Sequence, residues 1–151
     1  MKKIINITFI ILVILGILII IIRTFFFDYY RVSGDSMNDT LYNGDIILIN
    51  KDKRTIKRHD IVVVKVNNEL VVKRVIALPN DKIKCINNII YINNIKIKEL
   101  YIKGITNDFN TISLSDNEYF IMGDNRENSI DSRNYGIVNK KTIKGIYITI
   151  K

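Results

Sequence analysis

An uninterrupted apolar segment near the N-terminus is the first strong pattern in the chain. From Ile4 to Ile22 no residue is charged, and Asn6 and Thr8 carry the only clearly polar side chains. A helix needs about 20 apolar residues to cross the hydrocarbon core of a bilayer. The segment is apolar on all sides, which argues against an ordinary core helix, and no small-residue cleavage site follows it. We therefore predict an uncleaved transmembrane anchor at residues 4–22.

Short apolar runs separated by turn-forming residues follow the anchor and indicate β-strands. Asn87-Asn88 and Asn93-Asn94 separate three of these runs, and asparagine tolerates the positive φ of tight hairpin turns. The pattern predicts an all-β domain of antiparallel strands after one N-terminal helix. The expected strands are residues 46–49, 61–66, 70–76, 82–86, 89–92, 95–98, 118–122 and 143–150.

The chain is long enough for one modest domain beside the anchor. We expect residues 1–3 to form a cytoplasmic tail, residues 4–22 the anchor, and residues 23–151 one extracytoplasmic domain. Residues 81–115 are expected to form a β-hairpin excursion from its main sheet. Lysines at positions 2 and 3 favour a cytoplasmic N-terminus, and the aromatic cluster at residues 25–30 resembles the belt with which helices leave a bilayer.

The charge of the chain favours an anionic partner. Its 151 residues carry a formal net charge of +8. The first 23 residues hold three basic residues and no acidic one, so the other 20 basic and 15 acidic residues leave +5. This excess favours contact with membrane lipids, whereas the scattered lysines argue against nucleic acid binding. With one cysteine, Cys85, and one histidine, His59, we expect no intrachain disulfide, no metal and no cofactor.

Lys73 lies in the apolar run 71–76 and is the best candidate for a general base. Burial disfavours the charged amine and lowers its pKa, which a lysine needs in order to act near neutral pH. Ser36 lies in a Gly- and Asp-rich turn, where backbone N–H groups can face a developing oxyanion. Singly, the two residues also fit a turn serine and a solvent-facing lysine. His59 with Asp60 is a competing base, but neighbouring strand residues face opposite sides of a sheet.

A polar block at residues 123–133 packs three acidic residues and two arginines into one loop. Arginine–carboxylate pairs can lock such a loop into a platform, and Ser129 could then hydrogen-bond the lysine amine. The same block also fits a solvated loop. A hydrolase that uses Asp124 and Asp131 as a carboxylate pair lacks supporting features.

Together and in this order, the three blocks resemble bacterial type I signal peptidases of the short, single-anchor kind with a Ser/Lys dyad. The resemblance spans nearly the whole part of the chain that follows the anchor. The matching positions are Ser36-Met37, Thr40-Leu41, Gly44-Asp45, Asp60-Ile61-Val62, Lys73-Arg74-Val75-Ile76, Leu78-Pro79, Asp81, Gly123-Asp124-Asn125-Arg126, Ser129 and Asp131-Ser132-Arg133.

The resemblance implies a membrane-bound serine endopeptidase that removes N-terminal signal peptides from exported preproteins. Ser36 would attack the scissile carbonyl, and Lys73 would take its proton and later activate the deacylating water. Ser129 would orient the lysine, and Asp131 and Arg133 would form a supporting ion pair. The walls of shallow pockets for small substrate side chains would be Met37, Leu41, Val71 and Val72.

The resemblance also implies surroundings and partners. The preprotein would bind as an added strand, because backbone hydrogen bonds supply affinity without demanding a particular sequence. The chain would lie in a bacterial plasma membrane, with its catalytic domain outside the cytoplasm, and could contact the secretion machinery.

Several positions depart from the residues that are usual in the family. Asp39 stands where proline is usual, and His59, Ala77 and Asn80 stand at or near positions of glycines. Gly34 takes the place of a serine that assists the oxyanion hole in some members. Two alternatives stay open: a specialised Ser/Lys processing peptidase, for example one that matures pilin, and a catalytically silent, membrane-tethered β module that binds peptides.

Overall fold

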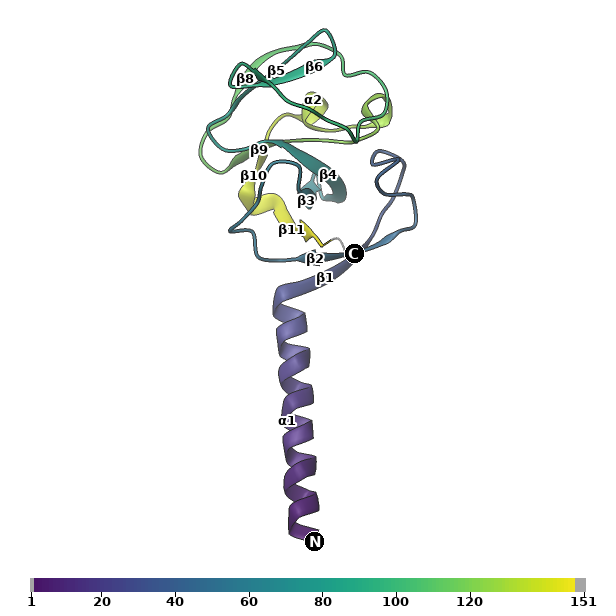
Figure 1. Ribbon diagram of the computed structural model, residues 1–151, viewed down its shortest axis with the longest axis vertical. Helices are drawn as coiled ribbons and strands as arrows, with labels where there is room; N and C mark the ends of the chain where they lie inside the picture. Colours follow the sequence, from purple (N-terminus) through teal and green to yellow (C-terminus); the bar gives the residue numbers. More distant parts are fainter. Residues whose placement is uncertain (1, 149–151) are drawn as a thin grey trace.

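A long apolar helix carries a β domain at one end (Figure 1). The computed structural model describes residues 2–148, so residue 1 of the expected tail and residues 149–150 of the expected last strand lie outside the described part. Helix α1 spans Lys2–Phe26. Its stretch Ile7–Phe26 has a mean hydropathy of 3.0 and is not buried in the protein, as is typical of a membrane-crossing helix.

Eleven strands in the described residues form two sheets in which every strand pair is antiparallel. The larger sheet has the order β1-β2-β11-β3-β4-β9-β10, and the smaller one has the order β7-β6-β5-β8. The all-β architecture with one N-terminal helix is thus confirmed. The elements after α1 are β1 (Phe27–Arg31), β2 (Ile46–Asn50), β3 (Ile61–Val66), β4 (Glu69–Ala77), β5 (Lys82–Ile86), β6 (Ile89–Ile92), β7 (Ile95–Lys96), β8 (Phe109–Ser113), β9 (Glu118–Met122), η1 (Arg126–Asn128), α2 (Ser132–Tyr135), β10 (Val138–Asn139), η2 (Lys140–Thr142) and β11 (Ile143–Tyr147).

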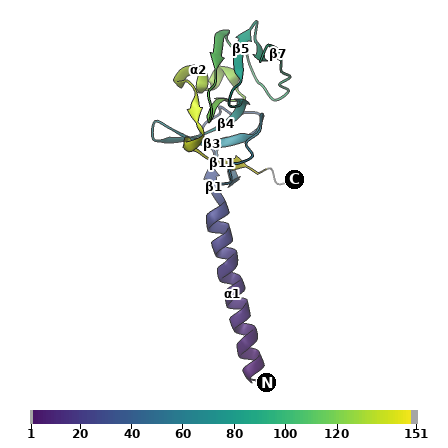
Figure 2. The same cartoon turned by 90° about the vertical axis from the view of Figure 1, so that its left-hand side faces the viewer.

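The two sheets lie at different distances from the end of helix α1. Strands β1, β2 and β11 lie at the end from which α1 emerges, whereas β5, β6 and β8 lie at the opposite end (Figure 1). The second view shows the same separation, with β5 and β7 at the far end (Figure 2). The small sheet is built from residues 82–113, within the segment expected to form a hairpin excursion.

Paired asparagines make the predicted hairpin turns. Asn87 and Asn88 have φ angles of 51° and 61°, and Asn93 and Asn94 have φ angles of 51° and 68°. Positive φ at both central residues gives a turn whose twist matches that of the flanking strands. The prediction missed β1, β8 and β10. It missed β1 because residues 25–30 were interpreted only as an aromatic belt. In the structure the helix ends at Phe26, and the next residues pair with β2.

Three apolar clusters hold the domain together. One joins the two sheets, with Phe120 of β9 packed among residues of β4, β5 and β6. The second lies on the β2 and β3 face and includes Met37 and Leu41 from the loop between β1 and β2. The third covers the other face of the large sheet, around Val62 and Val75. The second cluster matters most for function, because it fixes the loop that carries Ser36.

Candidate active site

The loop that carries Ser36 is anchored on both sides by buried side chains. Val32, Met37 and Leu41 are each at most 5% exposed and pack with residues of β2 and β3. The Met37 carbonyl accepts the Leu41 N–H at 2.9 Å, which closes the turn just after the serine. Ser36 itself is half-buried at the rim of this cluster. Burial of its apolar neighbours therefore positions the serine and leaves its hydroxyl accessible.

Lys73 reaches Ser36 from β4. Its Nζ atom donates to Ser36 Oγ at 2.6 Å, and only 4% of the residue is exposed. Burial lowers the pKa of Lys73 from 10.5 to about 8, with the nearby Asp131 opposing and Arg133 assisting the shift. About a tenth of the amine is therefore neutral at pH 7. A neutral amine can accept the hydroxyl proton along the same short contact.

Asp131 holds a platform beside the lysine. Its Oδ2 atom accepts hydrogen bonds from Ser129 Oγ at 2.8 Å and from the Gly123 N–H at 3.0 Å. Arg133 contacts both of its oxygens, through Nε and Nη2, each at 2.8 Å. Burial opposes ionisation of Asp131, but these hydrogen bonds hold its pKa below the ordinary value. The carboxylate therefore stays charged in a buried place.

Ser129 takes a different partner from the one the sequence suggested. Its hydroxyl donates to Asp131, and within residues 7–148 the structure gives it no hydrogen bond to Lys73. Ser129 therefore lies next to the dyad and bonds the carboxylate that faces the lysine.

Gly123 marks the point where three segments meet. A Cβ atom at this position would fall 2.5 Å from the Ser36 carbonyl oxygen and even closer to the Ser129 hydroxyl. The next segment then ties the nucleophile loop down, because the Asn125 N–H donates to the Ser36 carbonyl at 3.0 Å. Asn125 Nδ2 adds a bond to the Asp35 carbonyl at 3.1 Å. Only a residue without a side chain allows this approach.

A buried ion pair locks the opposite side of β4. Arg74 Nε donates to Asp124 Oδ1 at 2.8 Å, and its Nη2 contacts Asp124 Oδ2 at 2.5 Å. Thr40 Oγ1, from the nucleophile loop, donates to the same Oδ2 atom at 2.5 Å. Asp124 is 0% exposed. With Asp124 and Asp131 each held by an arginine, neither carboxylate is free for acid–base work, so the structure gives the carboxylate-pair hydrolase no support.

His59 is not placed to serve Ser36. Its Nδ1 atom hydrogen-bonds Tyr101 Oη at 2.8 Å, and the Asp60 carboxylate accepts the Lys57 N–H at 2.7 Å. The sequence analysis assumed that His59 and Asp60 are neighbours on a strand and face opposite sides of it. That assumption was wrong, because His59 precedes β3 and lies in a turn with a φ of 73°. That left-handed conformation explains why glycine suits this position. Burial, as the largest influence, lowers the pKa of His59 and so favours the neutral ring.

A strap from the small-sheet side, residues 99–106, was not found from the sequence. Glu99 forms a buried ion pair with Arg126 at 2.5 Å, and Arg126 Nε donates to the Gly123 carbonyl at 3.0 Å. The Lys103 N–H donates to the Asp124 carbonyl at 2.8 Å. The strap thus supports residues 123–133, the segment that contains Asp131 and hydrogen-bonds the loop of Ser36. No local pattern links Glu99 to an arginine so far along the chain.

The proposed substrate-binding residues divide between two clusters. Met37, Leu41 and Val72 share the cluster beneath the nucleophile loop, whereas Val71 packs against the cluster on the other face of the sheet. Within the described residues the Ser36 N–H donates to no protein acceptor, so it is available to an oxyanion. Gly34 has no side chain, so this position offers no hydroxyl as a second donor to the oxyanion.

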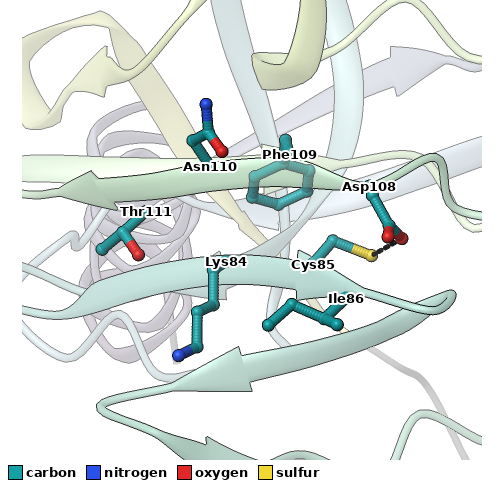
Figure 3. A pocket seen from close by; sticks show the side chains of 7 residues that line it. All are labelled: Lys84, Cys85, Ile86, Asp108, Phe109, Asn110 and Thr111. Carbon is teal, nitrogen blue, oxygen red and sulfur yellow. Dashed lines mark hydrogen bonds between the residues drawn. The ribbon is translucent and has the colours of Figure 1, made fainter.

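A separate depression lies over β5 and β8 of the small sheet (Figure 3). The Cys85 thiol points toward Asp108 there, with its Sγ atom 3.9 Å from Oδ1. Burial raises the pKa of this thiol to about 11, so it stays protonated and weakly nucleophilic. Across residues 2–148 no group of three or more potential ligand side chains is arranged to hold a metal ion.

Comparisons with known proteins agree on one family. Residues 2–150 match the family model described as signal peptidase, peptidase S26. The chain is 40% identical over 149 residues to signal peptidase I of Bacillus amyloliquefaciens, which covers 89% of this chain and 80% of that protein. It is 40% identical over 150 residues to signal peptidase I S of Bacillus subtilis strain 168, with coverages of 89% and 82%. A crystal structure of a signal peptidase I from Enterococcus faecalis V583 aligns with a TM-score of 0.58 at 28% identity, over 62% of this chain and 97% of that one.

Proposed function

Because the chain belongs to the signal peptidase family, peptidase S26, we propose that Ser36 and Lys73 are the catalytic dyad of a membrane signal peptidase. Such an enzyme removes N-terminal signal peptides from preproteins. The observation that carries the residue assignment is the 2.6 Å contact between the amine of Lys73 and the hydroxyl of Ser36. The contact joins a nucleophile to a buried base, as nucleophilic catalysis requires.

Acylation begins with a neutral Lys73. As Ser36 Oγ attacks the scissile carbonyl carbon, its proton passes to Lys73 Nζ. The developing oxyanion accepts a hydrogen bond from the Ser36 N–H, which has no competing protein acceptor among the described residues. The carbon–nitrogen bond then breaks, and the leaving amine takes the proton from Lys73. This step returns the base to its neutral form and leaves an acyl ester on Ser36.

Deacylation uses the same two groups. Neutral Lys73 takes a proton from a water molecule, whose oxygen attacks the ester carbon. The ester bond breaks, and the proton returns to Ser36 Oγ. The enzyme is restored without a cofactor, because one lysine serves as base in both halves of the reaction.

Asp131 and Arg133 act in opposite directions on the pKa of the Lys73 amine. The Asp131 carboxylate raises the pKa of Lys73, and Arg133 lowers it. Arg133, which pairs with Asp131 at 2.8 Å, therefore opposes the effect of the carboxylate on the amine. Burial is the largest influence and lowers the pKa of the lysine. We assign Ser129 a positioning role, since it bonds the same Oδ2 atom of Asp131.

Substrate binding uses apolar groups next to the dyad. Met37, Leu41 and Val72 would contact the small side chains that precede the cut, and their shared cluster supports this assignment. Val71 remains a proposed pocket residue, reached from the other side of β4. The preprotein segment would add as a strand, so that backbone hydrogen bonds fix the scissile carbonyl above Ser36.

The family is membrane-anchored, and α1 provides one apolar helix of sufficient length. We propose that the N-terminus lies in the cytoplasm and that the catalytic domain lies outside the plasma membrane. The positive charges of residues 2 and 3 support this orientation. Contact with the secretion machinery belongs to the same proposal, because preproteins reach this side of the membrane through it.

The direct test is cleavage of a purified preprotein in detergent by the wild type, Ser36→Ala and Lys73→Ala, with the cut located by mass spectrometry. One cut after a small-x-small segment, lost in both variants although they fold, would support the dyad. Normal cleavage by either folded variant would exclude it. A folded wild type that cleaves none of several preproteins would favour the silent peptide-binding module.

A further inference from the structure

Five lysines gather near the end of the domain from which the anchor emerges. Lys53 follows β2, Lys65 lies on β3, and Lys140, Lys141 and Lys144 lie on η2 and β11. Two depressions of the molecular surface meet at Lys141. One is shared with Lys53 and Lys140, and the other with Lys65 and Lys144. The five side chains therefore border one continuous region, which we call the basic surface.

The basic surface keeps its positive charge. Within residues 7–148 none of its lysines forms an ion pair, and Lys53 Nζ lies 3.5 Å from the Lys140 carbonyl oxygen. Three neighbouring acidic residues leave an excess of positive charge against the five lysines. The Asp52 carboxylate pairs with Arg54 and also interacts electrostatically with Lys140, Glu118 accepts a backbone N–H, and Glu69 is exposed at the start of β4. Lys65, Lys141 and Lys144 are exposed to solvent, and unpaired cations at this density attract anions.

Strand register places Lys144, one member of the basic surface, near the end of the anchor helix. The Lys51 N–H donates to the Phe26 carbonyl at 2.8 Å, and its ammonium donates to another carbonyl of the last turn of α1. Asn50 pairs with Ile146 on β11, two residues from Lys144. Two strand residues span about 7 Å. Figures 1 and 2 both show β11 at the helix end of the domain.

We propose that the basic surface docks on anionic lipid head groups next to the anchor and thereby orients the catalytic domain over the bilayer. This inference rests on the membrane-bound function proposed above. A single helix fixes the domain to the membrane but leaves its tilt free. A second, electrostatic contact restricts the tilt, so that Ser36 stays at one height above the membrane. The charge complementarity favours a lipid surface, because about fivefold in the binding equilibrium is gained for each lysine close to anionic lipids.

Amine labelling of the full chain in nanodiscs tests the contact. One nanodisc contains phosphatidylcholine alone, and the other also contains phosphatidylglycerol. With an amine-reactive reagent and mass spectrometry, we expect the basic surface to be labelled more slowly in the anionic discs, by about fivefold or more at low salt. High salt should remove the difference. Lys82, Lys96 and Lys98, exposed on the small sheet and in the loop that follows it, are controls in the same sample and should not respond. Equal labelling in both discs would overturn the proposal.

Matched charge variants test its consequence. The triple variant Lys65→Gln, Lys141→Gln, Lys144→Gln should lose the dependence of cleavage rate on phosphatidylglycerol, because three lysines together contribute about a hundredfold to docking. The control, with the same replacement at positions 82, 96 and 98, loses equal charge and should keep that dependence. Both should cleave like the wild type in detergent, whereas a wild type inactive in detergent would count against the proposed function instead. If the triple variant instead cleaved acidic preproteins more slowly in detergent, and other preproteins normally, the basic surface would bind the preprotein. That result would overturn the proposed lipid contact.

Discussion

Replacing Lys73 by methionine should stabilise the fold while it abolishes cleavage. The side chain is 4% exposed, and burial lowers the pKa of its amine from 10.5 to about 8. The charged form is therefore less stable in the folded protein than in the unfolded chain. Methionine keeps the length of the side chain and removes the charge.

The size of the effect follows from linkage between protonation and folding. At about pH 6.5 the lysine is charged in both states, and the shift of about 2.5 units destabilises the wild type by about 3 kcal/mol. The folded-state pKa is depressed, so this penalty is complete below about pH 8 and fades as the pH rises toward 10.5. At about pH 9.5 roughly 1.5 kcal/mol should remain.

The assay is urea unfolding of the full chain in detergent, followed by far-ultraviolet circular dichroism at both pH values. The variant should exceed the wild type by about 3 kcal/mol at the lower pH and by about half of that at the higher one. Ser36→Ala is the control, because it also abolishes cleavage but changes no buried charge. A gain of equal size at both pH values would assign the effect to packing. No gain at either would refute the claim that burial lowers the pKa of this lysine.

Three further outcomes follow from the same contacts. The acidic limb of the pH profile for kcat/KM should have an apparent pKa near 8 with a slope of one, because only neutral Lys73 accepts the proton; a flat limb in a stable enzyme would contradict the base assignment. Gly123→Ala should lose most activity and at least about 2 kcal/mol of stability, since its Cβ would overlap the Ser36 backbone. Gly16→Ala is the control and should change neither activity nor stability, because a Cβ there would meet no atom within 4 Å. Similar effects of the two substitutions would show that the loop around Gly123 shifts to accommodate the Cβ atom. Glu99→Gln should cost about 3 kcal/mol, because it leaves a fully buried arginine unpaired, and slower cleavage should accompany it. Asp52→Asn, in an exposed pair, should change urea unfolding little, and equal losses for both would refute the importance of burial.

Much of the fold was predictable because its signals are local. The apolar segment, the β pattern and the asparagine turns each depend on neighbouring residues, and the structure places helix, strands and hairpins where those patterns lie. Strand β1 was missed because Phe27–Arg31 reads equally well as an interfacial aromatic cluster. Only its pairing with β2 decides between the two structures.

The candidate site was predictable in part. Lys73 was proposed from the sequence because it lies in an apolar run, where burial is expected. Ser36 and the polar block at residues 123–133 were proposed because of the chemistry of their residue types. The contacts among them were not predictable. The hydroxyl of Ser129 could bond either the lysine or a carboxylate, and the sequence does not choose between these two partners. The strap was missed because the partner of Glu99 is set by packing of the small sheet against the large one.

The sequence alone therefore determined the long apolar helix, most of the strands, the excess of positive charge and the residue types that can carry the chemistry, since these depend on side-chain properties and short-range spacing. Only the tertiary structure decided that Lys73 meets Ser36, that Asp131 pairs with Arg133, and that five separate lysines border one surface. Each of these depends on contacts between segments that are distant in the chain. Such contacts form when apolar clusters and strand register bring the segments together, and the pKa of the lysine is lowered only once that burial is complete.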